Sequence, residues 1–209
     1  MFPSILLATY IAAAAALVLA PGPGQALVLT RSITSGRRAG IMTSLGLNVG
    51  TMVHTVAAAL GLSAILATSA TAFSIVKYAG ALYLIYLGLK SLLERSPQLA
   101  TQPTVPETPR QAFVRSVTIG ILNPKVALFF LAFLPQFVDP KRGPVFLQFV
   151  ILGAILACIG ITFDTLLASI AGKLGHWFAQ NPRFTLWRQR VTGGVMVVLG
   201  VELALTQRN

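Results

Sequence analysis

Charged side chains are scarce in this sequence, and acidic ones most of all. Of 209 residues, 10% are charged and only 5 are Asp or Glu, whereas 55% are hydrophobic. A water-soluble domain carries about 25% charged residues, so these proportions exclude an ordinary soluble fold and a disordered chain. The mean hydropathy of +0.77 is typical of a helical bundle whose outer surface faces lipid.

Cysteine and histidine are nearly absent, which restricts the chemistry. The single cysteine, Cys158, excludes an internal disulfide and a cysteine-based metal cluster. Two histidines, His54 and His176, are too few for a zinc site of the usual spacing. We therefore expect neither a metal nor a cofactor.

Long uncharged stretches predict membrane-spanning helices. Residues 2–30 contain no charged side chain, which exceeds the ~20 residues that cross a bilayer. A secretory signal peptide is the alternative, but no Lys or Arg precedes the apolar run and membrane sequence follows it. Residues 39–76 are too long for one span, so we expect a turn at residues 68–71. The six predicted spans lie in residues 2–30, 40–67, 73–93, 113–138, 145–171 and 190–206.

Two connecting segments differ from the spans in composition. Residues 94–111 contain four prolines and few apolar side chains, which predicts a solvated cytoplasmic linker at 94–112 between two halves, residues 1–93 and 113–209. Residues 172–190 mix Trp and Phe with basic side chains, as expected for a segment lying at the membrane interface.

The distribution of Lys and Arg predicts an orientation. With the N-terminus outside, the inner segments carry eleven of these residues and the outer segments three, and positive charge favours the inner side. We therefore expect a multi-pass protein of the bacterial inner membrane with both termini periplasmic. The net charge of +11 then reflects topology and contact with anionic lipid, not nucleic-acid binding.

Both halves begin with an apolar helix that proline interrupts. The interruptions are Pro-Gly-Pro-Gly at 21–24 and Asn-Pro-Lys at 123–125, and basic hinges follow at 36–40 and 141–144. Because each half has three spans, the halves enter the membrane from opposite sides, as in inverted-repeat transporters. The predicted fold is an all-α membrane protein of six transmembrane helices, arranged as two inverted three-helix halves with broken first and fourth helices.

The first break consists of Pro21, Gly22, Pro23 and Gly24. Proline lacks a backbone donor and glycine adds freedom, so the helix should stop here and restart at Pro23. Backbone groups freed within a membrane must face protein or a wet cavity, which favours a substrate site. The alternative is a simple kink at the cytoplasmic end of the span.

The second break predicts a helix start inside an apolar run. Asn123 is a favoured N-cap residue and Pro124 suits the first helical position. Lys125 lies about 18 Å along the fourth span, at ~1.5 Å per residue. A helix N-terminus and an ammonium group together attract an anion such as a substrate carboxylate. Alternatively, the helix begins at the inner interface and Lys125 lies among the headgroups.

Three further polar residues are candidates for the site. Asp164 is the only acidic side chain well inside a predicted span; it could bind an amine, carry a coupling proton or neutralise Lys125. His54 could join a proton relay or simply pack in the bundle. Asn48, flanked by glycines, could face a cavity or allow close helix packing.

Taken together, these motifs resemble the LysE/RhtB family of bacterial amino-acid exporters. The resemblance implies a plasma-membrane protein of about six spans that exports amino acids using the proton gradient, with an acidic residue where Asp164 stands. It does not specify which amino acid is exported. The resemblance is carried by residues 20–24, 35–40, 46–50, His54, 120–125 and 129–137.

The functional expectation is a secondary transporter rather than an enzyme. Its partners would be an amino acid and membrane lipid, with a homo-oligomer left open. Two alternatives are a passive small-solute pore and a membrane-embedded enzyme acting on lipids. The enzyme is disfavoured because the sequence offers no nucleophile–base pair or acidic metal-binding motif.

Overall fold

The computed structural model describes residues 2–19, 22–68, 70–93, 106–180 and 182–205, and the regular elements in these ranges are all helical. The prediction of an all-α protein is therefore confirmed for this part of the chain. The elements are α1 (Ser4–Leu19), α2 (Pro23–Thr34), α3 (Arg37–Thr68), α4 (Ala70–Leu93), α5 (Pro109–Ile121), α6 (Pro124–Ala132), the 3-10 helices η1 (Leu134–Phe137) and η2 (Pro140–Arg142), α7 (Val145–Gln180) and α8 (Pro182–Leu205).

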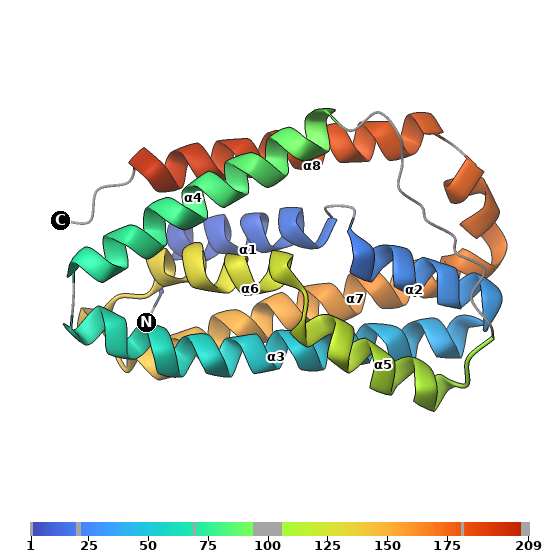
Figure 1. The fold of residues 1–209 in the computed structure, drawn as a ribbon, viewed down its shortest axis with the longest axis horizontal. Helices are drawn as coiled ribbons and strands as arrows, with labels where there is room; N and C mark the ends of the chain where they lie inside the picture. The colour runs from blue at the N-terminus through green and yellow to red at the C-terminus, as the bar shows by residue number, and fades with distance from the viewer. Residues whose placement is uncertain (1, 20–21, 69, 94–105, 181, 206–209) are drawn as a thin grey trace.

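Two long helices, α3 and α7, run the length of the molecule beside one another (Figure 1). Helix α3 also packs along α5, and α2 packs on both α3 and α7. Helices α4 and α8 pair with each other along one side of the bundle (Figure 1). The two halves therefore repeat one order of elements. Each has a bent pair (α1–α2 or α5–α6), then a long helix (α3 or α7), then a last helix (α4 or α8), and the two last helices pair with each other.

Both predicted breaks are present. Helices α1 and α2 meet at 56°, and α5 meets the α6–η1 segment at 46°. After the first break the chain restarts as α2 at Pro23, and after the second break it restarts as α6 at Pro124, as the sequence predicts. The two bent pairs, α1–α2 and α5–α6, run in opposite directions along the long axis (Figure 1). The start of α1 and the end of α8 lie at the same end of the bundle (Figure 1).

The described residues contain fewer candidate spans than the six predicted. By length and composition, the described residues hold two helices able to cross a membrane, Arg37–Gly61 and Val145–Ala171, or up to four if each bent pair counts as one span. In α4 the apolar stretch is the shorter Tyr78–Leu93. The count of six spans therefore stays a prediction.

Several boundaries differ from the sequence prediction. The turn at 68–71 is confirmed by the change from α3 to α4, although Ser69 itself lies outside the described residues. The predicted linker is wrong at its end, because α5 already begins at Pro109 and the Glu107 side chain is only 12% exposed. The predicted interfacial segment 172–190 is also helical, since α7 continues to Gln180 and α8 begins at Pro182. Apolar composition alone does not show where a helix ends.

Small residues let the helices approach closely. An added Cβ at Gly50 of α3 would overlap the backbone of Gly120 in α5. A Cβ at Gly88 of α4 would lie 2.7 Å from the carbonyl oxygen of Gly193 in α8. Small residues at such crossings are the usual means by which membrane helices pack. The α3–α5 and α4–α8 contacts are therefore backbone against backbone.

An aromatic cluster fills the bundle at the end where α1 begins. Tyr10 of α1 lies against Phe129 of α6 and Phe137 of η1, and Phe133 lies between these two phenylalanines. The Tyr10 hydroxyl donates to the Leu152 carbonyl of α7 at 2.7 Å. Because Tyr10, Phe129, Phe133 and Phe137 are at most 3% exposed, this aromatic cluster fills the interior at that end of the bundle.

Candidate functional site

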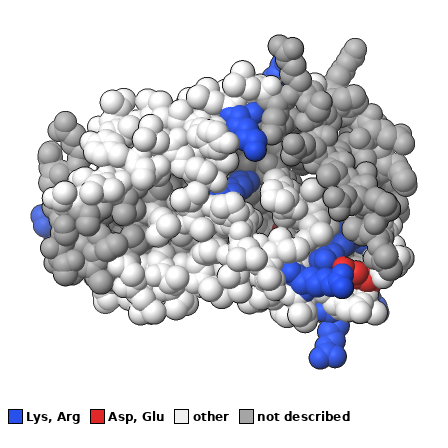
Figure 2. Space-filling view, in the orientation of Figure 1, with Lys and Arg blue, Asp and Glu red and all other residues white. Residues whose placement is uncertain are grey.

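A small cavity of about 100 Å³ lies between the two helix breaks. It is bordered by both sides of the first break, by the start of α6, and by the middle turns of α3 and α7. The surface is hollowed near its middle, and basic atoms are visible inside the hollow (Figure 2). The lining residues are Leu17, Val18, Gly22, Pro23, Gly24, Gln25, Leu47, Asn48, Thr51, Gly120, Asn123, Lys125, Val126, Leu156, Gly160 and Asp164.

The first break leaves carbonyl oxygens without their helical partners. In an unbroken helix the Leu17 carbonyl would accept from residue 21, which is a proline without an N–H group. The Lys125 ammonium donates to this oxygen instead, at 2.7 Å. Similarly, the Gln25 side-chain amide donates to the Val18 carbonyl. Two side chains thus replace the missing backbone donors at the end of α1.

The second break is capped by its own residues. The Asn123 side chain accepts from the Lys125 backbone N–H at 3.1 Å, and Pro124 occupies the first helical position. This confirms the N-cap predicted from the sequence. Because the cap places Lys125 in the first turn of α6, its ammonium reaches the end of α1, and one residue connects the two breaks.

The acidic side of the cavity is Asp164 of α7, which is 7% exposed. Its carboxyl group lies near the Ser44 hydroxyl of α3 and interacts electrostatically with Lys125. The neighbouring Asn48 amide donates to the Ser44 carbonyl at 2.9 Å. A Cβ at Gly160 would lie 3.0 Å from the Asn48 side-chain oxygen, so the glycine makes room for this amide. The cavity therefore presents one Lys and one Asp side chain, together with neutral amides.

Most residues predicted for the site come together here. Gly22, Pro23, Gly24, Asn48, Asn123, Lys125 and Asp164 line the cavity, whereas Pro21 lies outside the described residues. Among the described residues, Pro124 and His54 do not line it. The His54 ring stacks against Phe130, with ring centroids 6.3 Å apart, which favours the packing interpretation of this histidine.

Sequence reasoning missed Gln25, Ser44 and Thr51. One signal was available for the last two: Ser44, Asn48, Thr51 and Thr55 are spaced 4, 3 and 4 residues apart, which places them on one face of a helix. Gln25 is an isolated amide directly after the Pro-Gly-Pro-Gly segment. Its role as a replacement donor depends on the fold and has no local signature.

The fold and the cavity define a class: a helical bundle with apolar candidate spans, whose two broken helices enclose a charged and polar chamber. A comparison with known families identifies the class further. The chain belongs to the LysE type translocator family, whose model matches residues 15–207.

Relatives align with this chain over nearly their full length. The uncharacterised membrane protein YrhP of Bacillus subtilis is 32% identical, over 96% of this chain and 99% of the relative. A homoserine/homoserine lactone efflux protein of Salmonella typhimurium is 30% identical, over 93% and 94%. A leucine efflux protein of the same organism is 29% identical, over 95% and 94%. No solved structure matches the chain significantly. The chain is thus a multi-pass bacterial membrane protein of this family.

Proposed function

We propose that this protein is a secondary transporter that exports amino acids from the cytoplasm and is driven by the proton gradient. Two relatives are named as efflux proteins for homoserine or its lactone and for leucine. The observation that carries the proposal is that Lys125 and Asp164 line one cavity between two helix breaks. Unwound backbone at membrane depth is a common element of transporter substrate sites.

The charges of the cavity suit a zwitterion that is neutral overall. The Lys125 ammonium and the N-terminus of α6 would hold the substrate carboxylate. The Asp164 carboxylate would hold the amino group. The aliphatic side chains of Leu17, Val126 and Leu156 would contact an uncharged substrate side chain.

The size of the cavity supports alternating access. Its volume of about 100 Å³ is below the ~300 Å³ at which pockets for drug-sized ligands begin. A substrate as large as leucine therefore needs the surrounding helices to separate, so we take this conformation to be one without space for the substrate.

We further propose six spans in two inverted halves, with both termini periplasmic. Three observations support this topology: the repeated order of elements, the opposite directions of the two bent pairs (Figure 1), and the excess of Lys and Arg at the end where α2 finishes and α3 and α5 begin. That end then faces the cytoplasm. The aromatic cluster faces the periplasm.

The test is efflux from cells preloaded with radiolabelled homoserine or leucine, with and without the gene. We expect gene-dependent efflux that a protonophore abolishes, because a proton-driven carrier needs the gradient. A passive pore would release substrate at the same rate after the gradient collapses. No gene-dependent efflux of any amino acid, despite confirmed membrane insertion, would contradict the proposal.

Proton coupling is tested at Asp164. We expect Asp164→Asn to insert and fold normally, to hold the substrate amino group more weakly, and to lose the pH dependence of the remaining efflux, because the amide has no charge and cannot exchange a proton. Asp139→Asn, at an exposed carboxylate outside the cavity, is the matched control and should behave as the wild type. Unchanged pH dependence in Asp164→Asn would rule out this residue as the proton site.

A further inference from the structure

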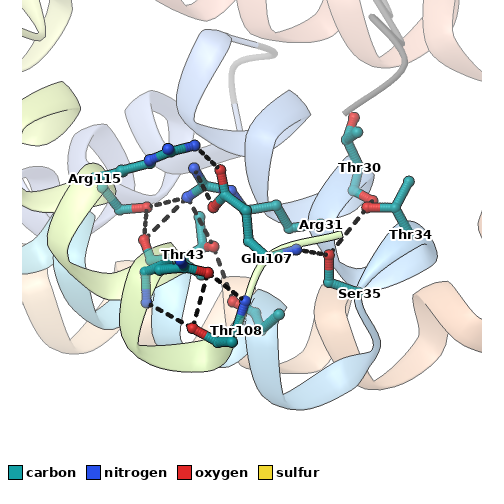
Figure 3. A network of polar contacts seen from close by, with 12 residues as sticks. Thr30, Arg31, Thr34, Ser35, Thr43, Glu107, Thr108 and Arg115 are labelled. Carbon is teal, nitrogen blue, oxygen red and sulfur yellow. Dashed lines mark hydrogen bonds and ion pairs between the residues drawn. The ribbon is translucent and has the colours of Figure 1, made fainter. Parts of the chain in front are cut away.

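A second polar cluster lies outside the cavity and is centred on Arg31. The Arg31 side chain is 5% exposed and forms an ion pair of 2.9 Å with Glu107. Its guanidinium also donates to the Ser116 hydroxyl at 2.6 Å, the Ala112 carbonyl at 3.0 Å and the Thr43 hydroxyl at 3.3 Å. The guanidinium thus joins α2 to α3, to α5 and to the segment that precedes α5 (Figure 3).

This cluster lies directly beyond the cavity on the same helices. On α3, Thr43 is one turn from the cavity residue Leu47, and on α5, Ser116 is one turn from the cavity residue Gly120. On α2, Arg31 is about 9 Å along the helix from Gln25, at ~1.5 Å per residue. The Arg31 cluster therefore lies between the cavity and the end of the bundle where α2 finishes.

The close contact between α3 and α5 beside this cluster leaves no room for a path between those two helices. An added Cβ at Gly46 of α3 would overlap the Phe113 carbonyl of α5, so these two helices already touch through their backbones. Opening a path at this end therefore requires α2 to separate from α3 and α5. The polar contacts that hold it there are those of Arg31, together with a hydrogen bond between Ser35 at the end of α2 and the segment before α5.

The position of Glu107 is set by local structure. Thr108 and Gln111 form a capping box at the start of α5, which fixes the residue before the cap. The Glu107 backbone N–H donates to the Ser35 hydroxyl at the end of α2, at 3.0 Å. Its second carboxylate oxygen pairs with Arg115 at 2.6 Å. Because Arg115 is 66% exposed, Glu107 keeps a partner at the surface when it leaves Arg31.

A buried ion pair is a poor choice for stability alone. Removing two charges from water costs as much as their attraction returns, and apolar replacements are often neutral or stabilising. The opposite end of the interior is filled by the apolar aromatic cluster. The Arg31 cluster differs from the aromatic cluster because water can replace its hydrogen bonds when the helices separate.

We propose that the Arg31–Glu107 ion pair is the inner gate of the transport path and closes the cavity from the cytoplasmic side. This inference rests on the proposed transport function and orientation. In the closed state, Glu107 holds Arg31 against Thr43 and Ser116. In the open state, Glu107 remains with Arg115 while α2 moves away and cytoplasmic substrate reaches Lys125 and Asp164.

The gate is tested by the accessibility of a cysteine in the cavity. The reporter is Thr51→Cys in a Cys158→Ser background, labelled with a membrane-impermeant maleimide in inside-out vesicles, where the cytoplasmic face is outside. We expect Glu107→Gln and Arg31→Gln each to raise the labelling rate at least tenfold. Asp139→Asn, which disrupts the Asp139–Arg142 ion pair at the other end of the bundle, is the matched control and should leave the rate unchanged.

Two further measurements separate a gate from general loosening. Right-side-out vesicles should label slowly in all variants, because the aromatic cluster still closes the other end. The double variant Arg31→Gln/Glu107→Gln should label no faster than Arg31→Gln alone, since the ion pair that Glu107→Gln removes is already lost when Arg31 is replaced. Unchanged rates in inside-out vesicles, or equal increases from both sides, would overturn the gate. Labelling needs no substrate, so absence of efflux together with sided labelling would refute the transport function and leave the gate intact.

Discussion

The same three-residue pattern occurs twice in the second half of the chain, as Asn-Pro-Lys at 123–125 and as Asp-Pro-Lys at 139–141. In both, the first side chain accepts from the backbone N–H of the lysine, at 3.1 Å and 2.9 Å. In both, proline occupies the first helical position, of α6 and of η2. The local geometry of the two segments is therefore the same.

Their surroundings differ. Lys125 lies in the cavity and donates to the Leu17 carbonyl across 108 residues of sequence. Lys141 is exposed, and Asp139 forms an ion pair of 3.0 Å with Arg142 at the surface. The comparison shows that the pattern determines where a helix begins, while the packing around it determines what the lysine can bind.

The largest expected difference between the two segments is in substrate binding. Lys125→Met should raise the Kd for the exported amino acid roughly 10- to 100-fold, since a bond to a charged group is worth about 1.5–3 kcal/mol. Lys141→Met, the matched control, should leave the Kd unchanged. Binding is measured on purified protein by the ligand-dependent shift in melting temperature. Equal affinity in the two variants would show that Lys125 only holds the broken helix.

The comparison also explains what the sequence could predict. The Asn123 cap and the restart at Pro23 depend on neighbours in the chain, so both were predicted. The bond from Lys125 to Leu17 depends on two breaks meeting in space, and no local pattern encodes it. The predicted linker was wrong at Glu107 for the same reason: its composition is that of a solvated segment, but a buried arginine on another helix provides a partner.

The helices of the fold also divide into features that the local sequence determines and features that depend on packing. Long apolar stretches determine helices such as α3 and α7, and their presence was predicted from composition. The end of α7 at Gln180 was not, because amphipathic residues suit both an interfacial segment and the continuation of a helix. The buried position of Arg31 was not predicted, since hydropathy does not show that a guanidinium has acceptors on three sides.

A smaller effect is expected when the first segment is converted into the second. Asn123→Asp keeps the oxygen that caps α6, so the melting temperature without substrate should be unchanged. The new carboxylate lies beside Lys125 and repels the substrate carboxylate, so we expect the Kd to rise about tenfold, or about 1.4 kcal/mol. The variant to compare with it is Asn123→Ala, which changes the cap but not the charge.

Asn123→Ala removes the cap without adding charge. The loss of an N-cap costs about 1 kcal/mol, which corresponds to a decrease in melting temperature of about 2–4 °C for a protein of this size. Asn123→Asp should therefore impair binding more than stability, and Asn123→Ala stability more than binding. The same response in both variants would mean that the cap, and not the charge in the cavity, controls the site.

The smallest effect is expected at the second segment and depends on pH. The backbone N–H of Lys141, followed by Arg142, holds the pKa of the Asp139 carboxyl below its ordinary value of 3.8. A depressed pKa in the folded state stabilises the fold above the unfolded pKa, and this stabilisation disappears as the pH falls through the folded pKa. Asp139→Asn should therefore melt slightly below the wild type at neutral pH, with the difference vanishing at pH values below the depressed pKa of the folded state. Because the carboxyl is exposed to solvent, the difference at neutral pH should be small.

Efflux by Asp139→Asn should match that of the wild type between about pH 5 and pH 8, because the Asp139 carboxyl is ionised throughout this range. Melting temperatures of purified protein and efflux rates in cells measure the two expectations separately. A difference in melting temperature that persists below the depressed pKa of the folded state, where the carboxyl is protonated, would show that the Asp139 side chain stabilises η2 through its shape rather than its charge. A change in the pH dependence of efflux would mean that the exposed segment takes part in coupling, and the contrast between the two Asx-Pro-Lys segments would fail.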